Sequence, residues 1–326
     1  MLRFLIKRSL IAVVTLIAIS AVTFLVFFAV PSSPALVMCS KNCTPTNMAA
    51  VERSLGLDKP LLTQYIDFHK GIVLGRVMPS FGECPAPCLG YSFRTREPVL
   101  NIIERALPVT VSIVLGAAVI WLALGISLGM FSALRQGTTF DKVSIGVSLV
   151  GASMPVYFFA MVLLLIFVFG FKIFSIPRYH SPFEDPGAFV AGMVLPWLAL
   201  GFVQSAAYAR LSRSQMLETL SEDFVRTARA IGLPKRTVYL RHALRAAITP
   251  IVTYAGLDLG ALLGGVVITE TVFGLKGLGG TAVQAVSDLN LPVVMATVLI
   301  AATFIVVSNV IVDCLYAFID PRVKLS

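Results

Sequence analysis

The sequence predicts an all-α integral membrane protein with six transmembrane helices and both termini in the cytoplasm. Three observations predict it: the composition, six long apolar runs, and the placement of lysine and arginine. Of the 326 residues, 57% are hydrophobic and only 13% are charged, whereas a soluble domain carries about 25% charged residues. A chain this apolar cannot hide its side chains in one soluble core, so lipid must cover much of its surface.

Six apolar runs are long enough to cross a bilayer, which takes about 20 residues. Arg3, Lys7 and Arg8 precede the first run, as they would in a secretory signal peptide. Its apolar stretch exceeds the roughly 7–15 residues of such a signal, so we expect a retained first helix. The predicted spans are, in order, Leu10–Val30, Leu107–Leu134, Val143–Phe171, Phe189–Ala209, Ile248–Phe273 and Leu291–Phe318.

Lysine and arginine gather on alternate sides of these runs, and this sets the predicted orientation. Both chain ends and the segment 209–247 are rich in them, whereas the two short loops on the other side hold only Lys172, Arg178 and Lys276. The basic segments therefore face the cytoplasm. We divide the chain into residues 1–100, the first helix plus one large extracytoplasmic loop, and residues 101–326, a five-helix core that contains the 209–247 loop.

The formal net charge of +9 makes nucleic acid and anionic lipid the two partners to consider. The basic residues lie in short clusters beside apolar runs, as cytoplasmic membrane flanks do. Neither a base-stacking platform nor a reading helix accompanies them. We therefore expect membrane lipid, and no nucleic acid, as the partner of this charge.

Four of the five cysteines lie in the predicted extracytoplasmic loop: Cys39, Cys43, Cys84 and Cys88. Because that side of the membrane is oxidising, two disulfides are the expected state, and three pairings stay open. A metal site fits less well, since zinc ligands are normally more tightly spaced and supported by histidine. The histidines are dispersed, so we expect no metal and no cofactor in this chain.

The 209–247 loop contains a short helix with signals at both ends. Ser221 is a good N-cap, Glu222 and Asp223 put negative charge in the first turn, and Glu222 can pair with Arg226. Gly232 can take the left-handed position that ends a helix. The predicted helix comprises Glu222, Asp223, Phe224, Val225, Arg226, Thr227, Ala228, Arg229, Ala230, Ile231 and Gly232.

Two uses of this short helix fit its composition. Phe224, Ala228 and Ile231 recur at a spacing that puts them on one face, and Arg226 and Arg229 lie on another. A helix this short is marginal alone in water and needs something to pack on. It is either an interfacial helix with its apolar face in the membrane, or a docking helix that enters a groove on a cytoplasmic partner.

Motifs in the loop decide between these uses. The loop reads RLSRSQMLE at 210–218, DFVRTARAIGL at 223–233 and RHALR at 241–245. These stretches closely resemble the cytoplasmic loop of the permeases of ATP-driven dipeptide and oligopeptide importers, binding-protein-dependent systems of the ABC class. Further landmarks, among them LGLDKPL at 55–61 and DPR at 320–322, extend the resemblance over nearly the whole chain. The long first loop is similar to the "B" type of permease.

The resemblance implies a function and a set of partners. In that family the short loop helix docks on the ATPase subunit, and the permease forms the pathway for a solute. The implied partners are a second homologous permease, two ATP-binding subunits or domains that bind ATP and magnesium, and an extracytoplasmic substrate-binding protein. Peptides are the implied solute, and a nickel chelate, haem or another small solute are the alternatives. Phe224, Ile231 and Ala246 stand where the family often has tyrosine, lysine and asparagine.

The fifth predicted span contains further candidate residues. Asp258 lies near its middle, where an ionisable group is costly in lipid and needs a partner or water. It either lines the pathway, facing the amino terminus of a peptide, or hydrogen-bonds to the second permease. Glu270, near the outer end, is either solvated or at the entrance of the pathway. Gly256, Gly260 and Gly264 allow two helices to approach closely, and contact between the two permeases is the expected use.

Two other classes of membrane protein fit less well. A secondary transporter or channel would carry charges in several spans or broken helices repeated in two halves, and we find one mid-span acid and no convincing repeat. A membrane enzyme would need clustered histidine, acid or cysteine side chains near one face. The sequence has no Gly-x-x-x-x-Gly-Lys-Ser/Thr motif, so we expect no ATP hydrolysis by this chain.

Overall fold

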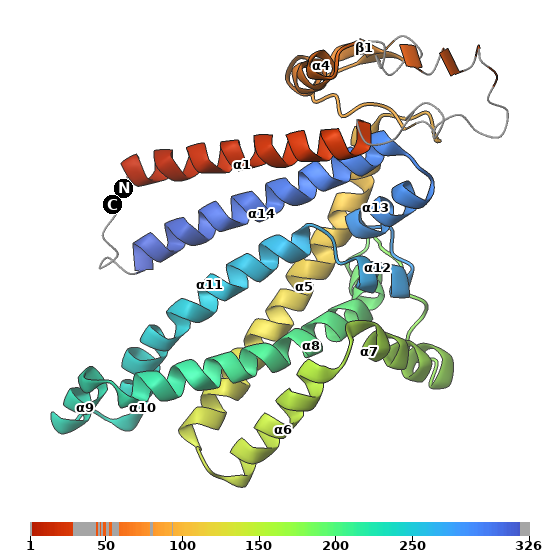
Figure 1. Cartoon of the computed structure of the whole chain (residues 1–326). Helices are drawn as coiled ribbons and strands as arrows, with labels where there is room; N and C mark the ends of the chain where they lie inside the picture. Colours follow the sequence, from red (N-terminus) through yellow and green to blue (C-terminus); the bar gives the residue numbers. More distant parts are fainter. Residues whose placement is uncertain are drawn as a thin grey trace.

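The protein is a bundle of long helices (Figure 1). The computed structural model describes residues 2–28, 44, 46, 48–49, 52–53, 59–78, 81–92 and 94–319. Within this part of the chain, five helical stretches are long and apolar enough to cross a membrane, and one bent pair of helices raises the number to six. The five stretches are Ile6–Phe27, Val99–Leu134, Pro186–Ser221, Lys235–Leu263 and Leu291–Cys314.

The bundle has two ends with different elements. Helices α1 (Leu2–Phe28) and α14 (Leu291–Ile319) run side by side, and α14 packs on α11 (Leu244–Leu263) with its other side. The short helices α9 (Asp223–Ala230) and α10 (Lys235–Thr237) lie at one end, where α1 also begins and α14 ends (Figure 1). The short helices α12 (Val267–Phe273) and α13 (Leu278–Ser287) lie at the other. This polarity places the predicted docking helix and Glu270 at opposite ends of the bundle.

Helices α5 (Val99–Leu134) and α8 (Pro186–Ser221) form the central pair of the bundle. Glycines bring their backbones together: a Cβ placed on Gly125 would lie 2.5 Å from the Cβ of Tyr208. A Cβ on Gly129 would clash with the carbonyl oxygen of Ala209, and one on Gly201 would lie 2.9 Å from Ile120. Small residues at such contacts let transmembrane helices pack closely.

The third predicted span is not one straight helix. The structure divides it into α6 (Thr139–Ser153) and α7 (Val156–Leu163), which continues as the π-helical segment η1 (Leu164–Gly170), with a bend of 99° between the two halves. Met154 at the break is extended, because the proline that follows disfavours the helical conformation. The prediction of an unbroken helix from 143 to 171 is therefore wrong.

The limits of the fifth predicted span are also wrong at both ends. The helix begins earlier, since α10 (Lys235–Thr237) and the π-helical η2 (Val238–Ala243) lead into α11 without a break. It ends at Leu263, because Gly265 has a φ of +136°, a conformation that ordinary residues rarely adopt. The predicted outer part is the separate helix α12.

The three glycines predicted to pack between two permeases pack within the chain instead. A Cβ on Gly260 would lie 2.5 Å from the Cβ of Ser308 in α14. A Cβ on Gly264 would lie 3.3 Å from the Cβ of Ala301 in the same helix. The spacing of these glycines predicted a close approach of helices, and α14 is the helix they meet. The α14 residues opposite Gly256, Gly260 and Gly264 are Val312, Ser308 and Ala301, in that order.

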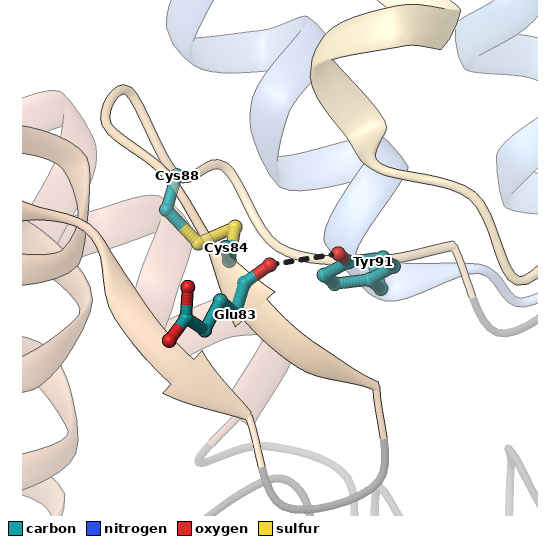
Figure 2. Close-up of a disulfide and its surroundings, with 4 residues drawn as sticks. All are labelled: Glu83, Cys84, Cys88 and Tyr91. Carbon is teal, nitrogen blue, oxygen red and sulfur yellow. Dashed lines mark hydrogen bonds between the residues drawn. A yellow bond between two sulfur atoms is a disulfide. The ribbon is translucent and has the colours of Figure 1, made fainter.

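A small unit precedes α5. It consists of helix α4 (Leu61–Leu74) and an antiparallel hairpin of β1 (Arg76–Met78) and β2 (Gly82–Cys84). The structure pairs Cys84 with Cys88, and the hydroxyl of Tyr91 donates to the carbonyl oxygen of Glu83 at 3.1 Å (Figure 2). Cys39 and Cys43 lie outside the described residues. The disulfide therefore closes a tight loop immediately after β2.

We expect a bulky side chain at Gly125 to destabilise the bundle. Leucine there would push α5 away from Tyr208, and overpacking of this kind costs about 1–3 kcal/mol. Unfolding of the purified Gly125→Leu variant by sodium dodecyl sulfate should show the loss. Gly146→Leu is the matched control, because that helical glycine of α6 has open space around it. Equal unfolding midpoints for the two variants would contradict the packing role.

Candidate docking helix and the helix ends that hold it

Helix α9 (Asp223–Ala230) follows α8 directly and is the short helix that the sequence predicted. Its first residue is preceded by Glu222 in extended conformation, with no side-chain cap. The prediction of Ser221 as N-cap is wrong, because Ser221 is still the last residue of α8. Its hydroxyl donates to the carbonyl oxygen of Glu218 at 2.7 Å. The long helix therefore runs to within one residue of the short one.

The end of α9 at Gly232 agrees with the sequence prediction. Gly232 has a φ of +82°, in the left-handed region. Its N–H donates to the carbonyl oxygen of Arg229 at 3.0 Å, and the N–H of Leu233 donates to that of Ala228 at 3.3 Å. These two bonds form a Schellman motif, which satisfies the last carbonyls of the helix. The chain then reverses direction and enters α10.

The packed face of α9 differs from the predicted one. Val225 and Ala228 are buried, whereas Phe224 and Ile231 are 44% and 70% exposed. Val225 and Ala228 belong to an apolar cluster formed by the ends of the neighbouring helices. Their partners in the cluster are Ala133 of α5, Met216 of α8, Val238 and Ala243 of η2, and Ala247 of α11. Phe224 and Ile231 consequently face away from the chain.

The charged side chains of α9 lie mostly on its exposed surface. Arg226 pairs with Asp223 at 3.5 Å, one turn earlier, and not with Glu222 as the sequence suggested. Because both side chains are well exposed, this pair adds little stability. The guanidinium of Arg229 lies over the ring of Tyr239 in η2, 5.9 Å from its centre. The outer surface of α9 therefore carries both acidic and basic side chains around two large apolar ones.

A buried ion pair ties α6 to α8 beside α9. Arg213 of α8 donates to both carboxylate oxygens of Asp141, from Nε at 2.7 Å and from a terminal nitrogen at 2.9 Å. Ser132 of α5 donates to Asp141 Oδ1 at 2.5 Å, and the N–H of Gly137 donates to Oδ2 at 2.9 Å. Asp141 is 3% exposed. Four donors thus hold one buried carboxylate where three helices meet.

Nothing in the local sequence indicates this ion pair. Asp141 and Arg213 are 72 residues apart along the chain, and each looks like an ordinary charge at a membrane flank. The acid in the first turn of α6, after a threonine cap, is equally typical of a solvent-exposed helix start. Only the packing of α6 against α8 brings the two charges together.

The two acids of the predicted pathway have partners within the chain. The hydroxyl of Tyr208 in α8 donates to Asp258 Oδ2 at 2.7 Å, so this acid bonds to its own chain. Glu270 is wholly buried, which overturns the expectation that it is solvated. Its carboxylate accepts from the hydroxyl of Thr110 at 2.6 Å and from the N–H of Gly280 at 2.7 Å. Glu270 therefore caps the start of α13 and leaves no surface for a solute.

Two family models match the chain. The N-terminal model of binding-protein-dependent transport system membrane components covers residues 1–114. The model of binding-protein-dependent transport system inner membrane components covers residues 125–325. The chain belongs to this family. As a member with several apolar helices, it is a multi-pass protein of the bacterial inner membrane.

Curated relatives of this family resemble the whole chain. The dipeptide transport system permease protein DppB of Escherichia coli K12 is 32% identical over 348 residues, covering 99% of each protein. The di/tripeptide permease DppB of Pseudomonas aeruginosa UCBPP-PA14 is 33% identical, again over 99% of each. The dipeptide permease DppB of Alkalihalophilus pseudofirmus is 31% identical over 99% of this chain and 100% of its own length.

We expect Asp141→Asn to destabilise this inner membrane component strongly. The change leaves the Arg213 guanidinium half-enclosed without a counter-charge, and breaking one partner of a buried pair costs about 3–5 kcal/mol. Arg213→Lys should destabilise the protein less, because an ammonium keeps the charge but cannot make the two parallel hydrogen bonds. Chemical unfolding in detergent measures both.

The exposed pair of Arg105 and Glu97, at 2.6 Å, provides the control for the buried one. Glu97→Gln should change stability by less than about 1 kcal/mol, as exposed pairs do. A double-mutant cycle for Asp141 and Arg213 that gave no coupling beyond that of Glu97 and Arg105 would contradict a structural role for the buried pair.

Proposed function

We propose that the chain is a translocation-pathway subunit of an ATP-driven importer of di- and oligopeptides. The observation that carries the proposal is α9, a short capped helix whose outer surface leaves Phe224 and Ile231 uncovered. The names of the relatives, which are peptide permeases, support the choice of solute. A nickel chelate, haem or another small solute is the alternative, and uptake assays with each solute separate them.

We propose a topology of six spans with both termini in the cytoplasm. The five long stretches and the bent pair of α6 and α7 make the six. In support, the start of α1 and the end of α14 lie at the same end of the bundle as α9 (Figure 1). The lysine and arginine placement assigns this end to the cytoplasm. The segment between α1 and α5 then forms the large extracytoplasmic loop, so that the division into residues 1–100 and 101–326 follows.

The proposed assembly contains a second homologous permease, two ATP-binding subunits or domains, and an extracytoplasmic substrate-binding protein. ATP and magnesium would bind to the ATP-binding subunits, since this sequence has no phosphate-binding loop. The chain would be non-catalytic and need no metal or cofactor. The groove on an ATP-binding subunit would take the outer surface of α9, with apolar anchors in its centre and charges of both signs at its rim.

The contacts of α9 suggest how force would reach the pathway. Val225 and Ala228 pack among the ends of α5, α8 and α11, which η2 leads into, so a displacement of α9 acts on three long helices at once. The Asp141–Arg213 pair extends this connection to α6. Asp258, which is half-buried between α11 and α8, is the candidate that would face the pathway and meet the amino terminus of a peptide. Alternating access then follows from moving helices, with no chemistry in this chain.

We expect Gly232→Val to abolish peptide uptake while membrane insertion stays normal. Gly232 has open space around it and a left-handed conformation, so valine would fail through backbone strain, about 1–2 kcal/mol or more for a β-branched residue. Uptake of labelled dipeptide into proteoliposomes with the full assembly measures the effect. Gly232→Asn is the matched control, because asparagine tolerates this conformation and should retain most uptake. Full uptake by Gly232→Val would refute the role of the capped helix.

We expect Phe224→Ala and Ile231→Ala each to weaken binding of the ATP-binding subunits. Burying such a side chain is worth about 1.5–3 kcal/mol, which corresponds to an affinity change of about tenfold or more. Titration of the purified subunits onto the permease pair measures the dissociation constant. Val286→Ala, at an exposed position of α13 at the other end of the bundle, is the control. Unchanged binding together with weaker adsorption to lipid vesicles would instead favour an interfacial helix.

A further inference from the structure

Helix α4 has a wide apolar surface of which the protein covers only one part. Phe68 and Ile72 lie against α1 and α14 in a cluster with Phe24 and Met295. The adjoining stripe of α4 consists of Leu62, Ile66 and Val73, which are 71%, 42% and 72% exposed. At about 100° per residue these three positions share one face, directly beside the packed one. A helix in water would not present this continuous apolar surface without a cover.

The contacts of α4 with α1 fix its depth. The hydroxyl of Ser20 and Nε2 of His69 lie 2.8 Å apart, and the hydroxyl of Tyr65 donates to the carbonyl oxygen of Ile17 at 3.2 Å. The apolar run of α1 ends at Phe27. At 1.5 Å per residue, Ser20 lies about 10 Å inside that end. This depth is within one leaflet of a bilayer whose hydrocarbon core is about 30 Å thick.

The direction of α4 is that of a helix lying in a membrane plane. Figure 1 shows α4 nearly along its axis, whereas α1 and α14 are seen from the side, so α4 crosses them. The face of α4 that points away from α1 and α14 carries Thr63, Asp67 and Lys70, with Leu74 as the last residue of the helix. The Lys59 ammonium, 2.6 Å from Asp67, lowers the pKa of that carboxyl and keeps it charged. An apolar face beside spanning helices and a charged face away from them define an interfacial helix.

We propose that α4 lies in the plane of the membrane and that lipid acyl chains cover the stripe of Leu62, Ile66 and Val73. Lipid is the occupant that the surroundings favour, because α1 exposes its own apolar side chains at the same depth, among them Val22 and Leu25. The stripe thus continues a surface that must already face lipid. Only the assignment to the outer leaflet rests on the proposed function and its topology.

In this placement, α4 would position the hairpin and the disulfide loop that follow it in the chain. The N–H of Cys88 donates to the carbonyl oxygen of Gly71 in α4 at 3.3 Å, so the disulfide loop is attached to the helix. The side-chain amide of Asn290, just before α14, donates to the hydroxyl of Ser92 at 2.7 Å. This bond attaches the other end of the segment. An in-plane α4 would therefore hold the hairpin and its disulfide at the membrane surface.

Tryptophan quenching in lipid nanodiscs tests the proposal on the full chain. Ile66→Trp and Leu62→Trp place the probe on the stripe, and Thr63→Trp places it on the polar face as the matched control. Signals from Trp121 and Trp197 are removed by subtraction of the unchanged protein. Lipids with brominated acyl chains should quench the two stripe variants about twofold more than Thr63→Trp, and aqueous iodide should show the reverse order.

Iodide quenching of Ile66→Trp and Leu62→Trp as strong as that of Thr63→Trp, with no effect of brominated lipid, would overturn the proposal. Protection from iodide that appears only when a purified substrate-binding protein is added would overturn it too, since the stripe would then be a protein docking surface. The experiment needs no transport, so a chain that failed to import peptides would still give either answer about α4.

Discussion

The backbone contact between α5 and α8 is the constraint on which the other features depend. In lipid, helices gain little from burying apolar side chains against one another, so close approach and polar pairs must hold them. Glycines of α5 allow that approach at Tyr208 and Ala209. The same contact brings Ser132 and Arg213 to the one carboxylate of Asp141. A wider spacing would leave this carboxylate buried without its donors, and α6 would lose its attachment.

The sequence predicted the existence of most spans but not their interruptions. Apolar length alone finds α1, α5, α8, α11 and α14, because a bilayer imposes that length on any crossing helix. A count of apolar residues does not detect the break at Met154 or the helix end at Gly265. The proline that follows Met154 and the glycine itself are the local signals for these two interruptions. The ion pair of Asp141 with Arg213 was not predictable, since nothing local relates residues 72 positions apart.

The candidate docking helix shows the same division between local and distant information. Its existence, its acidic start and its end at Gly232 follow from signals within a few residues. Its packed face cannot be predicted in this way, because two groups of side chains recur at helical spacing. One group contains Phe224 and Ile231, and the other contains Val225. The neighbouring helix ends decide between them, since Val225 and Ala228 are the side chains that pack against those ends. The larger apolar side chains are left outside, which is the arrangement that a partner subunit can use.

The connection of α9 limits which movements can open a pathway. The chain passes from α8 through α9 and then through α10 into α11, so α9 is the covalent link between two long helices. Within the bundle, Tyr208 of α8 bonds to Asp258 of α11. A displacement of α9 must either carry both helices together and keep this bond, or separate them and break it. In the second case the carboxylate of Asp258 loses its partner in a region of low polarity, and water or a cationic solute must replace the hydroxyl. If Asp258 faces the pathway as we propose, a solute amino group at that position would favour the separated arrangement of α8 and α11.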